Sequence, residues 1–193
     1  MLIQDAIRFI QEIDKLKSDC RKTLNYNQQR EENTAEHSWH LAMSVIVFKD
    51  FSNFPNLDLL KAIKLALVHD IVEIDAGDVI VYKEDPEKYD REKKAAERIF
   101  GLLPQELSKE FHALWEEFEA KKTPEAQFVN ALDRFLPMMS NHLNGGHTWK
   151  KFNVNHAQVL AKNQKAISSG SEELWKMASE MLEKSIAQGD LNR

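Results

Sequence analysis

The sequence places a histidine and four carboxylates within ten residues, at the end of an apolar stretch. The stretch covers residues 59–78 and reads LLKAIKLALVHDIVEIDAGD. Its ionisable residues at this end are His69, Asp70, Glu73, Asp75 and Asp78. Burial of a carboxylate or an imidazole is costly unless the group is paired or bound to a metal. We therefore expect a cation or an ion network here, with the rest of the chain organised around it.

Two further residues complete a candidate metal-binding set. His37 lies near the start of one expected helix, and Asp133 lies among apolar neighbours in another. With His69 and Asp70 they supply two imidazoles and two carboxylates, which suit a borderline or hard divalent cation, while the lack of thiolates disfavours soft metals. Spacing alone leaves the alternative open, because a partly buried histidine is more often a hydrogen-bonded core residue.

Apolar periodicity predicts the helices that must position these residues. The expected helices span about residues 3–16, 33–48, 57–74, 86–100, 104–120, 123 onward, 155–168 and 171–188. Asn33 and Thr123 are expected to cap their helices, and Pro137 is expected to kink or interrupt the helix that begins at Thr123. The apolar face of the first helix is expected to be core, and residues 18–33 are read mostly as loop. Without convincing strand alternation, the prediction is an all-α globule of about seven to eight helices.

Length and composition narrow the classes of protein. The 193 residues fit one domain, and the net charge of -5, with acids and bases interleaved, argues against a nucleic-acid-coating surface and against an electrostatic membrane anchor. Cys20 is the single cysteine, which excludes an intrachain disulfide and suits a reducing cytoplasm. The amphipathic start and the short apolar runs predict a soluble chain with neither a signal peptide nor a membrane span.

The order of the candidate ligands resembles that of the HD-domain phosphohydrolases. Glu36-His37-Ser38, His69-Asp70, and Asp133 within ALDR match the H…HD…D pattern. The similarity is closer to bacterial HD-domain hydrolases of the 5′-deoxynucleotidase-like group, through REENTAEHSWHLA at 30–42, HDIVEIDAGD at 69–78, and residues 102–134. It implies a single HD domain over residues 1–193, with a motif-bearing core at about 30–140. The C-terminal segment adds little to it.

The resemblance also implies roles for individual residues. The metal ligands would be His37, His69, Asp70 and Asp133, holding one divalent ion such as Mn²⁺, Co²⁺, Mg²⁺, Fe²⁺ or Zn²⁺. Glu73 and Asp78 match the acidic pair of the deoxynucleotidase-like members and would serve in acid/base chemistry. Physical chemistry agrees, because a carboxylate near a metal-activated water can orient it or protonate the leaving alcohol. The alternatives to a catalytic role are a surface or capping residue for Glu73 and a turn-forming residue for Asp78.

Two arginines ahead of His37 are candidates for binding a substrate phosphate. The planar guanidinium of Arg21 or Arg30 suits a phosphate group, and Arg30 belongs to the matched motif. The alternative for both is a solvated loop charge. Arg134 is expected to orient its neighbour Asp133 through a salt bridge.

The leading hypothesis is therefore a phosphomonoesterase acting on deoxynucleoside 5′-monophosphates. A phosphodiesterase or a nucleotide pyrophosphohydrolase on the same scaffold stays open, because the four ligands do not encode the leaving group. A non-catalytic, metal-containing helical binding protein is the alternative from another class. The expected partner is a small phosphorylated substrate such as a nucleotide, and neither a nucleic-acid nor a membrane partner is expected. Dimerisation is implied only by analogy with similar proteins.

Overall fold

The computed structural model describes residues 3–26, 30–78, 80–83 and 85–193. The elements in chain order are α1 (Ile3–Ile13), a 3₁₀ turn (Asp14–Lys17), β1 (Cys20–Leu24), β2 (Glu31–Asn33), α2 (Thr34–Phe48), a second 3₁₀ turn (Lys49–Phe51), α3 (Leu59–Val68), α4 (Glu73–Ala76), α5 (Lys88–Phe100), α6 (Gln105–Ala120), α7 (Pro124–Leu143), α8 (His147–Lys151), α9 (His156–Gly170) and α10 (Glu172–Ala187). The predicted helical class is confirmed. None of the described helices is long and apolar enough to cross a membrane.

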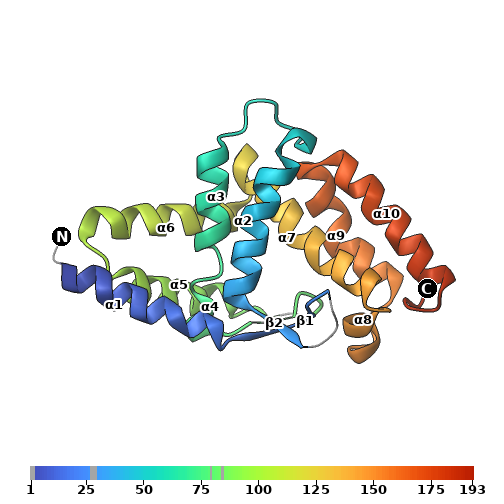
Figure 1. Cartoon of the computed structure of the whole chain (residues 1–193), viewed down its shortest axis with the longest axis horizontal. Helices are drawn as coiled ribbons and strands as arrows, with labels where there is room; N and C mark the ends of the chain where they lie inside the picture. The colour runs from blue at the N-terminus through green and yellow to red at the C-terminus, as the bar shows by residue number, and fades with distance from the viewer. Residues whose placement is uncertain (1–2, 27–29, 79, 84) are drawn as a thin grey trace.

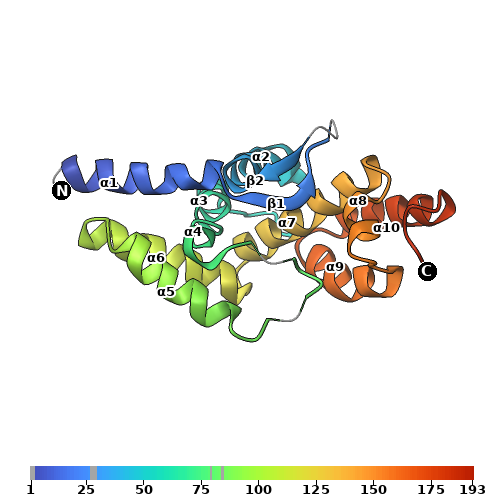
Figure 2. The same ribbon diagram turned by 90° about the horizontal axis from the view of Figure 1, so that it is seen from below.

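Helices α2, α3 and α7 form the centre of the molecule, and the remaining helices extend from it in two directions (Figure 1). Helices α1, α5 and α6 lie at the end that carries the N-terminus, whereas α8, α9 and α10 lie at the end that carries the C-terminus (Figures 1 and 2). The central helices bury apolar side chains such as Leu41, Leu65 and Leu132, which have no exposed surface. This shared core fixes the relative positions of the three helices that supply the candidate ligands.

The helix starts follow the capping chemistry expected from the sequence. The side chain of Asn33 accepts a hydrogen bond from the backbone N–H of Glu36, and the Glu36 carboxylate accepts one from the backbone N–H of Asn33. This reciprocal pair holds the first turn of α2, where His37 lies. Thr123 caps α7 in a similar way, with Pro124 at the first helical position.

The central apolar helix is shorter than predicted. It ends at Val68, a turn spans residues 69–72, and the single-turn helix α4 begins at Glu73. The ionisable residues therefore sit on a turn and on a new helix start rather than on one continuous helix. Helix α7, in contrast, continues through Pro137, so the predicted interruption is not found there.

The described part of the segment 18–33 is not mostly loop, which corrects the prediction; residues 27–29 lie outside the described residues. Strands β1 and β2 pair antiparallel, with Cys20 opposite Asn33 and Leu24 opposite Glu31. The strands are short, polar and half-buried, so they lack the apolar alternation that marks a strand in sequence. The hairpin packs against α7 and α8, and it carries Arg21 and Glu32 toward the centre of the molecule.

The apolar face predicted for residues 3–16 is core only in part, which corrects the prediction. Leu16 is buried and Ile13 packs against the core, but the start of the face is open. Ile3, Ile7 and Ile10 are 69%, 49% and 62% exposed, whereas Phe9 is buried and packs edge-on against Phe111. Periodicity identifies which face of a helix is apolar, but it does not show whether another element covers that face.

Candidate metal centre and catalytic pocket

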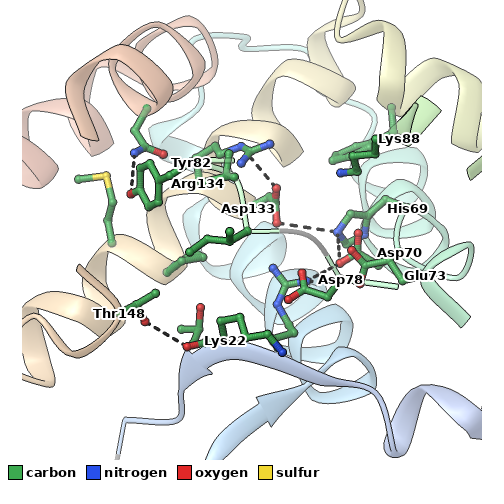
Figure 3. A pocket seen from close by; sticks show the side chains of 18 of the residues that line it. Lys22, His69, Asp70, Glu73, Asp78, Tyr82, Lys88, Asp133, Arg134 and Thr148 are labelled. Carbon is green, nitrogen blue, oxygen red and sulfur yellow. Dashed lines mark hydrogen bonds and ion pairs between the residues drawn. The ribbon is translucent and has the colours of Figure 1, made fainter. Parts of the chain in front are cut away.

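The four predicted metal ligands converge at one point, although they come from α2, the turn after α3, and α7. His37 Nε2 lies 2.9 Å from Asp133 Oδ1, and His69 Nε2 lies 3.0 Å from Asp70 Oδ2 and 3.8 Å from Asp133 Oδ1. Both histidines are buried, and the two carboxylates are only 14% and 12% exposed at the side chain. Figure 3 shows His69, Asp70 and Asp133 directed toward one another.

The two imidazole rings are oriented by groups behind them. His69 Nδ1 lies 2.9 Å from the backbone carbonyl oxygen of Ala66, which can only accept a hydrogen bond, so Nδ1 is the donor. His69 Nε2 is thereby left as the free ring nitrogen facing the carboxylates. For His37, Nδ1 lies 3.5 Å from Glu32 Oε2 on β2. Histidine ligands of metals usually have such a partner on the second nitrogen.

The residues present fit a divalent metal ion. His69 Nε2 is buried and has no hydrogen-bond partner among the described residues, even though it lies close to two carboxylates. An unsatisfied buried nitrogen of this kind is costly and is satisfied by a cation. One ligand atom each from His37, His69 and Asp70 lies within 4.8 Å of the others, and Asp133 contacts both histidines.

The charges of the cluster strongly perturb its protonation. Burial alone would raise the pKa of Asp70 and of Asp133, but His69 and Arg21 lower the former and His37 and Arg134 lower the latter, so both pKa values fall below normal. Burial and Arg21 would lower the pKa of His37, yet Asp133 and Glu32 raise it to about 9. The two carboxylates are therefore ionised near neutral pH, as metal binding requires.

Glu73 and Asp78 line the same cavity as His69, Asp70 and Asp133. Burial raises the pKa of Glu73 well above its normal value, and the charges of Asp70 and Asp78 add to this effect. Burial also raises the pKa of Asp78. Gly77, with φ of 76°, allows the turn that presents Asp78 to the cavity. Carboxyl groups with raised pKa values in a cleft are suited to proton transfer near neutral pH.

The structure separates the two candidate phosphate-binding arginines. Arg21 lines the cavity, and its Nη1 donates to Asp70 Oδ2 at 2.8 Å and lies 3.8 Å from Glu73 Oε2. Arg30 lies in a different hollow and is bound by Glu36, with Nη1 donating to Oε2 at 2.7 Å. Arg30 is therefore not brought together with the ligands. Arg134 Nε lies 3.8 Å from Asp133 Oδ2, in the position expected for an orienting partner.

The cavity has a volume of about 980 Å³, including space open to solvent at its mouth. Besides the residues already named, its walls include Lys22, Tyr82, Lys88, Glu92, Phe118 and Asn163. The sequence did not identify three residues at or near the site: Glu32, Lys88 and Glu92. Glu32 directly precedes the capping residue but looks like its neighbour Glu31, and Lys88 and Glu92 resemble a solvated pair four residues apart on a charged helix.

Comparisons with known proteins agree with this geometry. The family model described as the HD domain matches residues 13–175 of the chain. The human protein 5'-deoxynucleotidase HDDC2 is 37% identical over 134 residues, and the zebrafish (Danio rerio) protein of the same name is 32% identical over 143 residues. These alignments cover 68% and 72% of this chain, and the chain spans slightly less than two thirds of the human protein, 64%. The alignment with the zebrafish protein covers 70% of that protein's length.

A solved structure is similar over nearly the whole chain. The crystal structure of a predicted metal-dependent phosphohydrolase from Magnetospirillum magnetotacticum MS-1 superposes with a TM-score of 0.95 at 39% sequence identity. The match covers 99% of this chain and 96% of that one. The similarity therefore extends through α9 and α10, beyond the motifs from which the resemblance was first identified.

Proposed function

The chain belongs to the HD-domain family, and we propose that it is a metal-dependent phosphohydrolase that releases phosphate from deoxynucleoside 5′-monophosphates. The observation that carries the proposal is the convergence of the four candidate ligands, three of which line one cavity together with Glu73, Asp78 and Arg21. The names of the relatives support the substrate class, since they are called 5'-deoxynucleotidases, and the protein in the similar crystal structure is described as a predicted metal-dependent phosphohydrolase.

His37, His69, Asp70 and Asp133 would hold one divalent metal. Two nitrogen and two carboxylate ligands suit Mn²⁺, Co²⁺, Fe²⁺, Mg²⁺ or Zn²⁺. When bound, such an ion lowers the pKa of a water molecule and polarises a phosphoryl oxygen. His37 faces a carboxylate with each ring nitrogen, which favours its protonated form. Metal affinity is therefore expected to rise with pH, because the metal displaces the proton on Nε2.

The chain's own residues supply phosphate binding and proton transfer. The guanidinium of Arg21 lies beside Asp70 at the cavity wall and can bind two oxygens of a phosphate. Burial raises the pKa of both Glu73 and Asp78, and the charge of Asp78 raises the pKa of Glu73 further, so the two carboxyl groups would hold one proton between them. The ionised carboxylate accepts a proton from the attacking water, and the protonated one donates to the leaving 5′-oxygen.

The proposal includes the cellular location and the oligomeric state of the enzyme. A cytoplasmic location is in keeping with the single cysteine, Cys20, which forms no disulfide. Homodimerisation is supported by apolar side chains left exposed on α1 and α2, among them Ile10, Trp39 and Val47. Sedimentation analysis tests the second point, with a dimer as the expected state.

A substrate panel tests the proposed reaction. Metal-stripped protein is resupplied separately with manganese, cobalt, magnesium or zinc and given matched deoxynucleoside and ribonucleoside 5′-monophosphates. Metal-dependent phosphate release confined to the deoxynucleotides is the expected result. Hydrolysis of a phosphodiester or a pyrophosphate in place of every monophosphate would redirect the proposal to the alternative leaving groups.

A further inference from the structure

We propose that Lys88 is a second cation that binds the substrate phosphate, and that Glu92 is a positioning residue that fixes the Lys88 ammonium at the cavity wall. The inference rests on the proposed function and extends it to residues that neither the sequence motif nor the relatives' names point to. It follows from the charge of the pocket, from the place of Lys88 in it, and from the burial of Glu92.

The pocket is rich in negative charge where a dianion has to bind. Asp70, Glu73, Asp78 and Asp133 all line the cavity. Arg21 is already engaged, since it contacts Asp70 at 2.8 Å and Glu73 at 3.8 Å. A phosphate monoester brings a further charge of about -1.5 to -2 near neutral pH. Besides a metal ion and the shared Arg21, a further cation is expected to balance the phosphate charge, and the candidates that line the cavity are Lys22, Lys88, Lys121 and Arg134.

Lys88 has the right position for that cation. It is the first residue of α5 and lines the cavity together with His69, Asp70 and Phe118. Figure 3 labels Lys88 on the cavity wall, on the side away from Lys22. Its side chain is 42% exposed, so the ammonium is open to a ligand. Lys88 also lines an adjoining hollow, whose basic residues outnumber its acidic residues Asp85 and Glu119. The other basic residues are Lys83, Lys121, Arg134 and Lys162.

Glu92 lies one helical turn beyond Lys88 and fixes it. The Glu92 side chain is only 5% exposed, and its Oε1 lies 3.2 Å from Lys88 Nζ. This is the single ion pair of Lys88 in the part of the chain that the structure describes. An ammonium has three donors, so one contact with Glu92 leaves donors that can face the cavity. Burial would lower the pKa of Lys88, but Glu92 and Asp70 raise it, which keeps the lysine charged.

Two other cations that line the cavity, Lys121 and Arg134, are less well placed than Lys88. Lys121 Nζ lies 5.6 Å from the centre of the Phe118 ring and 3.9 Å from Glu119. Arg134 lies beside Asp133, where it balances a candidate ligand. Neither Lys121 nor Arg134 forms an ion pair with a carboxylate as buried as Glu92, the partner of Lys88. The geometry therefore favours Lys88.

Four variants separate phosphate binding from a purely structural ion pair. Lys88→Met removes the cation, and Lys88→Arg restores it. The double variant Lys88→Met/Glu92→Leu removes both charges, so it leaves no unpaired buried carboxylate to weaken the fold. Lys64→Met is the matched control, because Lys64 forms an exposed pair with Glu110 outside the cavity. Each metal-loaded protein is assayed for kcat and KM with a deoxynucleoside 5′-monophosphate and titrated calorimetrically with inorganic phosphate.

Loss of one charged hydrogen bond is expected to weaken phosphate binding and raise KM about tenfold to a hundredfold in Lys88→Met and in the double variant. Lys88→Arg should recover most of the affinity, and Lys64→Met should match the wild-type protein. Phosphate affinity and KM that stay at the wild-type level in the folded double variant would overturn the inference. If the wild-type protein hydrolysed no monophosphate, the proposed function would fail, but the phosphate titration would still decide the role of Lys88.

Discussion

His37 Nε2 lies 2.9 Å from Asp133 Oδ1, across 96 residues of sequence. The contact joins the first turn of α2 to the middle of α7, and both helices pack against α3, which leads to His69 and Asp70. The candidate metal centre thus lies where the three central helices meet. Its geometry depends on their packing rather than on any local motif.

The first prediction concerns the ligand from α7. Asp133→Asn removes one anionic ligand from the buried cluster, so metal affinity should fall by more than about 100-fold, beyond the loss typical of residues that only support a ligand. Metal content after dialysis, measured by mass spectrometry, checks this, with circular dichroism as the test of folding. The exposed Asp50→Asn is the control. Retention of one metal per chain by Asp133→Asn would remove Asp133 from the ligand set.

The second prediction concerns Glu32, which lies 3.5 Å from His37 Nδ1 and 3.9 Å from Arg21 Nε. Glu32→Gln weakens the group that orients the imidazole, so metal affinity should fall about 10- to 100-fold. The neighbouring Glu31→Gln is a matched control, because Glu31 pairs with Lys151 at 3.0 Å instead. Competition with a fluorescent metal chelator measures both affinities. Equal affinities in the two variants would contradict a role for Glu32.

The third prediction separates catalysis from metal binding. Glu73→Gln removes a proton-transfer group and should slow phosphate release by about 10²- to 10⁴-fold while one metal per chain is retained. Asp75→Asn, on the same short helix, is the control, because Asp75 Oδ1 accepts from Arg98 Nη2 at 2.7 Å and does not line the cavity. Unchanged hydrolysis by Glu73→Gln would exclude Glu73 from the mechanism.

The fourth prediction is a pH dependence of stability in chelator-treated protein. Burial raises the pKa of Glu73 in the folded protein well above 4.5. Above pH 4.5 the unfolded chain releases this proton while the folded protein keeps it, so the contribution of Glu73 to stability falls as pH rises through the folded pKa. The free energy of unfolding of Glu73→Gln, relative to the wild-type value, should therefore increase from about pH 5 to about pH 8. The same pH dependence of the free energy of unfolding in Glu73→Gln and in the wild-type protein, measured with urea, would contradict this prediction.

The fifth prediction concerns the contact between α7 and α9, which closes one side of the cavity. A Cβ at Gly170 would lie 2.5 Å from the carbonyl oxygen of Gln127 and 2.6 Å from Ala131 Cβ. Gly170→Ala should therefore lower the free energy of unfolding by about 1–3 kcal/mol through overpacking. Urea denaturation measures the change, and the exposed Ser169→Ala is the control. Equal stability of the two variants would show that the helices separate at little cost.

Local signals in the sequence predicted much of the fold. The Asn33 cap, the Thr123-Pro124 start and the apolar periods placed most helices correctly, because these features act within a few residues. The β1–β2 hairpin was missed because its strands are short and polar. The exposure of Ile7 was missed because coverage of a helix face depends on distant elements.

The candidate site was predictable where a motif carried it. The order of His37, His69-Asp70 and Asp133 identified candidate ligands that converge in the structure, but spacing did not distinguish Arg21, which lines the cavity, from the outlying Arg30. Supporting residues such as Glu32 depend on strand pairing that brings distant segments together. No local pattern reports such contacts.

One titration tests the central claim most directly. Metal is added stepwise to stripped wild-type protein and to Asp133→Asn, and bound metal and phosphate release from a deoxynucleoside 5′-monophosphate are followed together. The wild-type activity should rise in proportion to the first equivalent bound and then level off, while Asp133→Asn should show neither tight binding nor activity. Release of phosphate without metal, or at the wild-type rate in Asp133→Asn, would contradict the account.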